Sequence, residues 1–145
     1  MAGFERQATI TWEGSVRDGR GTVRAGTGAF DLPVTFPSRV ADPDGLTGPE
    51  ELLAAAHASC YAMALAATLS RSGGSVARLH VSATVKADFS EAGLVIRAAY
   101  LRVLADGLIG LAEDAFLKVA REAERRCPVS NALRSQIHIE LEAIG

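Results

Sequence analysis

The chain of 145 residues has two cysteines, and they lie in unlike surroundings. Cys60 stands among alanines in the segment AAHASCYAMAL, whereas Cys127 precedes a proline in RRCPVSNAL. An ionised thiol is a nucleophile that an oxidant converts to a sulfenic acid, and a second thiol can close that acid into a disulfide. Pro128 suits the first position of a short helix, which would place Cys127 at a helix N-terminus, where the thiolate is favoured. The two cysteines are therefore a candidate redox pair.

Two other interpretations of these thiols remain open. Free cysteine is among the most often buried residue types, so both thiols could be inert parts of the core. His57 and Cys60 lie one helical turn apart, and with Cys127 they also fit a zinc site. His80 and His138 alternate within predicted strands, and we expect them to be ordinary polar positions.

A thiol among alanines needs a nearby cation, because burial in apolar surroundings raises its pKa and keeps it inert. The candidates are Arg39 in FPSRVAD, Arg17 and Arg20 in VRDGRG, and His57. An arginine is the better choice because it is always charged. Its planar fork can also bond a thiolate and a carboxylate together.

Glu50 is the candidate carboxylate. On an α-helix it lies on the same flank as Cys60, whereas Glu51 points to the opposite side. The helix rises about 15 Å between Glu50 and Cys60, too far for direct contact within one chain. Glu50 must then act through an intermediary or on Cys60 of a partner chain. Thr47 and Glu50, in the segment TGPE, also fit a helix capping box.

The first part of the chain is predicted to form three short strands. The segments ATITWEG, GRGTVRAG and GAFDLPVTF carry the alternation and glycine punctuation of hairpins. Residues 37–49 are rich in turn-forming residues, and we expect an irregular loop there. A helix is predicted from about Pro49 to about Arg71, because proline and two glutamates suit its first turn. The segment SGG ends it.

The second half predicts two long strands, roughly 76–89 and 94–105, joined by the turn SEAGL. Residues 110–126 have apolar side chains at helical spacing, which predicts an amphipathic helix. The chain closes in an alternating strand, QIHIELEAI. The order βββ-α-ββ-α-β predicts one α+β domain over residues 1–145, with antiparallel sheets packed on two main helices.

Residues 52–69 are nearly all apolar, and the length of this run is about the lower limit for a membrane span. The run is rich in alanine and interrupted by polar residues, and a helix that is apolar all round is also expected at the centre of a soluble domain. Such a helix needs more cover than one sheet face provides, and its alanines allow a second helix to approach closely. We therefore expect an intertwined homodimer and no membrane insertion.

Composition narrows the function classes. Hydrophobic residues make up 48% and charged residues 22% of the chain, which is the balance of a globular protein. A formal net charge of −2 gives no electrostatic reason to expect nucleic acid or an anionic membrane as partner. The start, MAGFERQATITWEG, is too polar for a secretory signal, so we expect a cytoplasmic protein, where structural disulfides are rare.

The segment TGPEELLAAAHASCYAMAL, followed a helix later by CPVSNAL, resembles the OsmC/Ohr family of bacterial thiol peroxidases. WEGSVRDGRGTV near the start and FPSRVAD before the helix extend the likeness over nearly the whole chain. The resemblance implies an antiparallel α+β fold and an interlocked homodimer with two active sites at its interface. It also implies reduction of organic hydroperoxides, and less generally of hydrogen peroxide, without metal, haem or flavin.

The resemblance also implies a role for each candidate residue. Cys60 matches the peroxidatic cysteine and Cys127 the resolving one, and their disulfide is reopened by an external dithiol such as a lipoyl group. Glu50 matches the carboxylate that orients the arginine. Arg39 matches the arginine of the OsmC branch, which the histidine in AAHASC and the WEG opening favour. The Ohr branch takes its arginine from a turn like RDGR. A redox sensor or a small-molecule-binding protein with little turnover is the alternative.

Overall fold

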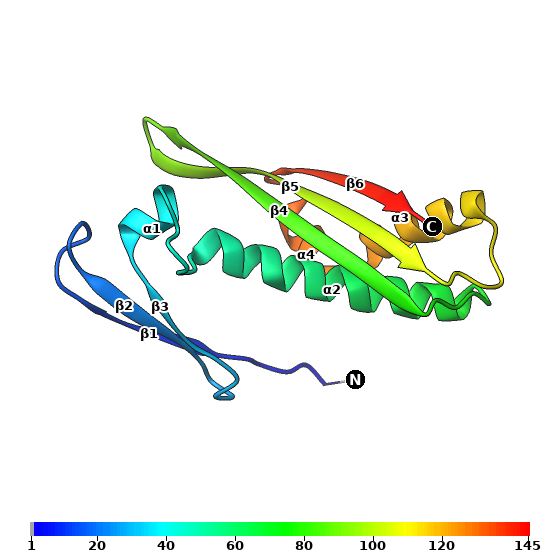
Figure 1. The fold of residues 1–145 in the computed structure, drawn as a ribbon, viewed down its shortest axis with the longest axis horizontal. Helices are drawn as coiled ribbons and strands as arrows, with labels where there is room; N and C mark the ends of the chain where they lie inside the picture. Colours follow the sequence, from blue (N-terminus) through cyan, green and yellow to red (C-terminus); the bar gives the residue numbers. More distant parts are fainter. Residues whose placement is uncertain (1) are drawn as a thin grey trace. The chain divides into compact units, whose positions relative to one another are not determined.

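The computed structural model describes residues 2–145, and their contacts divide the chain into two compact units. The first unit ends at Leu52 and the second spans Leu53–Gly145 (Figure 1). The long helix α2, Pro49–Arg71, begins in the first unit and continues into the second. The single domain over residues 1–145 stays a prediction.

The first unit contains the three predicted strands. They are β1 (Ala8–Glu13), β2 (Arg20–Ala25) and β3 (Asp31–Val34). They pair antiparallel in the order β1-β2-β3, so the hairpin pattern in the sequence is confirmed.

A short helix, α1 (Phe36–Val40), follows β3, so the expectation of an irregular loop over residues 37–49 is wrong at its start. The Thr35 side chain caps this helix by accepting a hydrogen bond from the Ser38 backbone N–H at 3.2 Å. Pro37 suits its first turn. Arg39 lies in the last turn of α1, so the helix fixes the direction in which its side chain leaves the backbone.

The second unit contains the rest of the predicted elements. After α2 come β4 (Arg78–Ser90), β5 (Gly93–Asp106), α3 (Glu113–Arg126), the short helix α4 (Pro128–Leu133) and β6 (His138–Ile144). The α2 bounds agree with the prediction, and α3 begins three residues later than predicted. Gly93 allows the tight turn between β4 and β5 because its φ is +100°.

The sheet order is β4-β5-β6, and the last pair differs from the prediction. β4 and β5 are antiparallel, but β5 and β6 run parallel, with Ala98 opposite His138 and Leu104 opposite Ile144. The expectation of antiparallel sheets throughout is therefore wrong for β6. The physical reason is the helical connection α3–α4. It brings the chain back toward the N-terminal end of β5, so that β6 runs in the same direction as β5. A parallel pair requires such a crossover.

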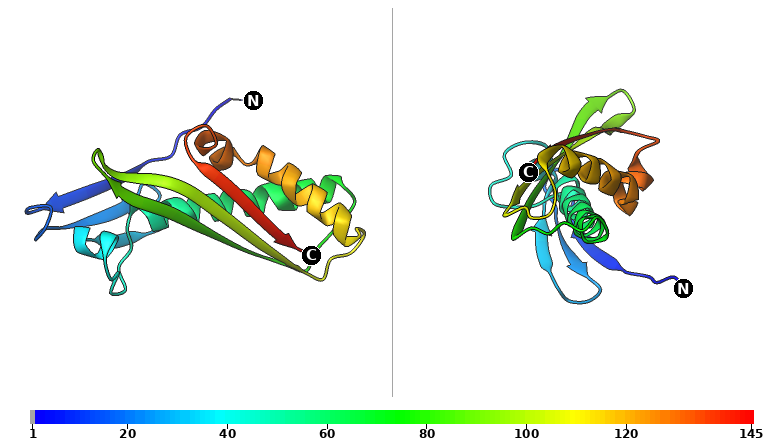
Figure 2. Two further views of the ribbon diagram at one scale, coloured as in Figure 1. Left: turned by 90° about the horizontal axis from the view of Figure 1, so that it is seen from above. Right: turned by 90° about the vertical axis from the view of Figure 1, so that its right-hand side faces the viewer.

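Helices α2 and α3 cover one face of this sheet (Figure 2). The core is a cluster of buried side chains from both helices, from β5 and from the residue that follows α3: Tyr61, Leu65, Leu69, Leu101, Val103, Phe116, Val119, Ala120, Ala123 and Cys127. One cysteine therefore belongs to the core of the second unit.

One face of α2 is buried and the other is exposed. His57, Tyr61, Leu65, Thr68 and Leu69 are its buried residues. By length and composition α2 could span a membrane, and only 28% of its most apolar window is buried within the chain. Since the buried stripe packs into the core with α3 and β5, the arrangement is that of a core helix with one uncovered side.

Candidate functional site

The structure gathers the four candidate residues into two pairs, each inside one compact unit. Cys60 and Cys127 meet in the second unit, and Arg39 and Glu50 meet in the first.

Cys60 lies on α2, half-buried, and packs against the core cluster that contains Cys127. Cys127 is fully buried at the junction of α3 and α4, where it ends the first helix and begins the second. Both are free thiols. The predicted position of Cys127 before a short helix that starts with Pro128 is confirmed.

The pKa of the Cys60 thiol is raised above its ordinary value, chiefly because burial disfavours the thiolate. The backbone N–H of Val129 acts in the opposite direction by donating toward the sulfur, and the neighbouring Cys127 thiol raises the pKa further. Neither the Val129 N–H nor the Cys127 thiol is a cation. The thiol environment within the second unit therefore favours the protonated form, and activation requires an additional positive charge.

Arg39 and Glu50 form a two-pronged ion pair between α1 and the first turn of α2. The Arg39 Nε donates to Glu50 Oε1 at 2.9 Å, and Nη2 donates to Oε2 at 2.6 Å. The Arg39 side chain is 31% exposed and the Glu50 side chain 17% exposed. The hydrogen bonds from Arg39 lower the pKa of the Glu50 carboxyl against the opposing effect of burial. Glu50 is therefore an ionised anchor for the guanidinium.

The bonds to Glu50 use two of the three guanidinium nitrogens. In the part of the chain that the structure describes, Nε and Nη2 of Arg39 hold Glu50, whereas Nη1 has no hydrogen-bond acceptor. A guanidinium bound along one edge presents its remaining N–H groups in a fixed plane. The pair can therefore receive a second anion beside the carboxylate.

The predicted capping box between Thr47 and Glu50 does not form. The Thr47 hydroxyl donates instead to Glu51 Oε1, at 2.7 Å. Glu51 therefore serves the helix start, while the Glu50 carboxylate is directed to Arg39.

Neither of the other candidate arginines shares this arrangement. Arg17 lies in the turn between β1 and β2, and Arg20 is the first residue of β2. Both are exposed, and within residues 2–145 neither forms an ion pair with a carboxylate. Arg39 is the candidate that is held by Glu50.

His57 is fully buried, and its Nε2 lies 2.7 Å from the Ser130 hydroxyl on α4. Burial lowers the pKa of His57, with Glu124 raising it and Arg134 lowering it to lesser degrees. His57 is thus a neutral imidazole and not the cation considered from the sequence. Ser130 is not among the residues predicted from the sequence, although its place one turn after Cys127 in CPVSNAL is a usable signal.

The alternative zinc site used His57, Cys60 and Cys127. Nothing in the described residues gathers three or more histidine, cysteine or acidic side chains around a common point for a metal ion. The His57 Nε2 faces Ser130. Of the remaining histidines, His80 is exposed and His138 lies 3.3 Å from Glu140 on the same strand.

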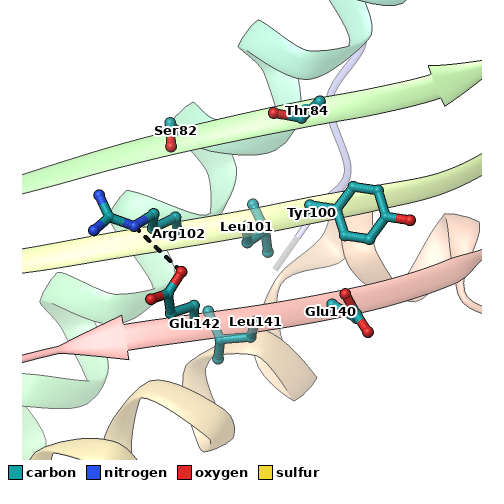
Figure 3. A pocket seen from close by; sticks show the side chains of 8 residues that line it. All are labelled: Ser82, Thr84, Tyr100, Leu101, Arg102, Glu140, Leu141 and Glu142. Carbon is teal, nitrogen blue, oxygen red and sulfur yellow. Dashed lines mark hydrogen bonds and ion pairs between the residues drawn. The ribbon is translucent and has the colours of Figure 1, made fainter.

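A shallow hollow of about 400 Å³ lies on the outer face of the sheet (Figure 3). Its lining residues come from β4, β5 and β6: Ser82, Thr84, Tyr100, Leu101, Arg102, Glu140, Leu141 and Glu142. Arg102 bonds Glu142 across the strands at 3.2 Å. Neither cysteine lines this hollow, so it is separate from the thiol pair.

These features define an α+β protein with two neighbouring free thiols and an arginine–glutamate pair. Residues 42–142 match the family model described as "OsmC-like protein". The chain is also 33% identical to peroxiredoxin OsmC of Escherichia coli over 140 residues, which cover 96% of each chain. The chain belongs to the OsmC family.

Solved structures agree with this assignment. The organic hydroperoxide resistance protein OsmC of Legionella pneumophila superposes with a TM-score of 0.80 over the full length of both chains, at 23% identity. The organic hydroperoxide resistance protein OhrB of Bacillus subtilis superposes with a TM-score of 0.72 at 25% identity, covering 94% of this chain and 97% of the other. The predicted OsmC/Ohr-like α+β fold is confirmed.

Proposed function

We propose that this protein is a cysteine-based peroxidase that reduces organic hydroperoxides, and to a lesser extent hydrogen peroxide, to alcohols or water. The observation that carries the proposal is the pair of free thiols, one half-buried and one fully buried, in contact beside the start of α4. The names of the relatives, peroxiredoxin and organic hydroperoxide resistance protein, point to the same chemistry.

In the proposed reaction the Cys60 thiolate attacks the terminal oxygen of ROOH. The O–O bond breaks, the alkoxide takes a proton and leaves as alcohol, and Cys60 becomes a sulfenic acid. The Cys127 thiol then attacks the sulfenic sulfur, which forms the disulfide and releases water. An external dithiol, such as a lipoyl group, reduces the disulfide and is itself oxidised.

Arg39 supplies the positive charge that the thiol pair lacks. Its unused Nη1 is suited to a thiolate or to the peroxide oxygens, where negative charge develops in the transition state. Glu50 fixes the guanidinium. The Arg39 guanidinium acts on Cys60 of the same chain or of a partner chain. We favour the partner, because Glu50 and Cys60 share one continuous helix and lie about 15 Å apart along it.

A homodimer with active sites at its interface is part of this proposal. The exposed side of α2 carries four alanines, Ala55, Ala56, Ala66 and Ala67, together with Met63, which is 73% exposed. An exposed helix side rich in small side chains is suited to close packing against an identical helix. Two free thiols are also compatible with a reducing cytoplasm, which is where we place the protein.

The test is steady-state consumption of cumene hydroperoxide by the purified protein with dihydrolipoamide as reductant. Wild type should turn over, and Cys60→Ser should not, because the variant retains the shape of the side chain but loses the nucleophile. If Cys60→Ser keeps most of the rate, the proposal is wrong.

The raised pKa of Cys60 favours a second candidate, a small-molecule-binding protein whose thiols are spectators. Titration of Cys60 with a thiolate-specific reagent separates the two. A spectator thiol would titrate above its ordinary pKa in the assembled protein, whereas the peroxidase requires a lowered pKa. Disulfide formation with one equivalent of peroxide but negligible steady-state turnover would instead identify a redox sensor.

A further inference from the structure

Helix α4 contacts α2 through its first turn and the cysteine that precedes it, at three points. Cys127 lies against Cys60, the Val129 backbone N–H is directed at the Cys60 sulfur, and Ser130 bonds His57. His57 precedes Cys60 by one turn on α2, and Ser130 follows Cys127 by one turn on α4. The polar contact and the thiol contact therefore lie side by side between the same two helices.

The His57–Ser130 contact is closed off from solvent. Both residues have zero exposed surface, and their Nε2–Oγ distance is 2.7 Å. A buried polar group that loses its partner destabilises the fold, because water cannot replace the hydrogen bond. Separating α4 from α2 at this point is therefore unfavourable, and the hydrogen bond fixes their relative position.

The second ring nitrogen indicates the protonation state. Among residues 2–145 nothing bonds the buried Nδ1 of His57. A proton there would be a buried donor without an acceptor, so the proton is assigned to Nε2, which donates to the Ser130 oxygen. The lowered pKa of His57 agrees with this neutral state.

The other end of α4 is held separately. Arg134 donates to Glu124 Oε1 on α3 at 2.6 Å, and to Asn131 Oδ1 at 2.7 Å. Glu124 is 9% exposed, so this ion pair is partly shielded from solvent. The helix is thus fixed to α3 at its C-terminal end, and the His57–Ser130 hydrogen bond joins its first turn to α2 beside the contacts with Cys60.

On the basis of the proposed peroxidase function, we propose that the His57–Ser130 pair is a positioning device for the disulfide-closing step. It holds the first turn of α4 against α2, so that the Cys127 sulfur faces Cys60 at the moment when Cys60 carries the sulfenic acid. In that step the S–O bond of Cys60 breaks and the S–S bond forms. The Cys127 proton leaves with the departing hydroxide as water. The Cys60 sulfur is reduced and the Cys127 sulfur is oxidised.

This positioning determines the fate of the sulfenic acid. The acid either closes onto Cys127 or reacts with a second peroxide to the sulfinic acid, which dithiols do not reduce. Closure depends on the distance and alignment of two sulfurs, and a displacement of about 1 Å can slow such a step by about a hundredfold. Loosening α4 should therefore slow closure and increase over-oxidation.

The test compares Ser130→Ala and His57→Leu with wild type. After one equivalent of cumene hydroperoxide, samples are quenched with an alkylating reagent, and disulfide and sulfinic acid are measured by mass spectrometry over time. We expect closure to slow by about tenfold or more in both variants, with a matching increase in sulfinic acid as peroxide is raised. The double variant should be no slower than either single one, because both remove the same hydrogen bond.

Two further variants separate positioning from general weakening of the fold. Tyr61→Phe removes another buried hydrogen bond of α2, from the Tyr61 hydroxyl to the Ala120 carbonyl on α3, and should close its disulfide at the wild-type rate. His57→Gln keeps a donor at the position of Nε2 and should close within about threefold of wild type. If Tyr61→Phe slows closure equally, or if His57→Gln is as slow as His57→Leu, the inference is wrong.

The remaining outcomes also test the inference or the proposed function. Unchanged closure in Ser130→Ala overturns the inference while leaving the proposed function intact. If His57→Leu does not fold, Ser130→Ala, which removes a single oxygen atom, carries the test alone. Wild-type protein that consumes no peroxide refutes the proposed function itself, which Cys60→Ser probes independently.

Discussion

Glu50 is expected to act on the reaction only through Arg39, and Glu50→Gln tests this. Glutamine keeps the shape of the side chain and one acceptor oxygen, but it loses the charge and places an N–H₂ group against the guanidinium. The variant therefore loses one of the two direct contacts, at 2.9 and 2.6 Å, and weakens the other. The guanidinium is then free to leave the position in which it receives an anion.

The size of the effect follows from the exposure of the pair. A hydrogen bond between charged groups contributes about 1.5–3 kcal/mol, and the 31% exposure of Arg39 places this pair near the lower end because solvent screens it. A loss of about 1.5 kcal/mol corresponds to about tenfold in kcat/KM. Removing the charge itself, in Arg39→Ala, should cost more. An interaction of about 4 kcal/mol at 4 Å and an effective dielectric constant of 20 corresponds to about a thousandfold.

The assay measures kcat/KM for cumene hydroperoxide in Glu50→Gln, Arg39→Ala and the double variant. Glu51→Gln is the matched control, because Glu51 lies in the same helical turn but bonds Thr47. We expect no loss in the control and at most about twofold between Arg39→Ala and the double variant. A tenfold loss from Glu50→Gln in the Arg39→Ala background would refute the reasoning, as would an unaffected Glu50→Gln.

Three further predictions concern the thiols and the core. Cys127→Ser should complete one turnover and then accumulate sulfinic acid at Cys60, measured by intact-mass spectrometry; sustained turnover would contradict the role of Cys127. Because the folded pKa of His57 is below its ordinary 6.5, the unfolded chain binds a proton first as the pH falls. The free energy of unfolding should therefore decrease below pH 6.5 in urea titrations, and less so in His57→Gln. Tyr61→Phe should lower the free energy of unfolding by about 1 kcal/mol, since it leaves the Ala120 carbonyl without this donor; an unchanged midpoint would show that the hydroxyl contributes nothing.

Local patterns in the sequence determined the elements that carry the chemistry. The proline and glutamates at the start of α2 and the glycines after it predicted a helix with the observed bounds. Pro128 predicted the short helix that begins just after Cys127. Because α2 is apolar all round, the sequence predicted that packing on one side would leave apolar surface uncovered. The other side of α2 is exposed in the structure. Each of these depends on residues within a few positions of one another.

Contacts between distant segments required the tertiary structure. Helical geometry excluded direct contact between Glu50 and Cys60 but left the partner of Glu50 open; the family resemblance implied Arg39, and the folded chain shows the ion pair. The parallel pairing of β6 depends on where the α3–α4 connection returns the chain, which alternation within a strand does not encode. The partner of His57 is likewise set by packing, because Ser130 lies in another helix. Sequence periodicity determines which face of an element is buried, whereas the long-range packing of the whole core decides which residues meet there.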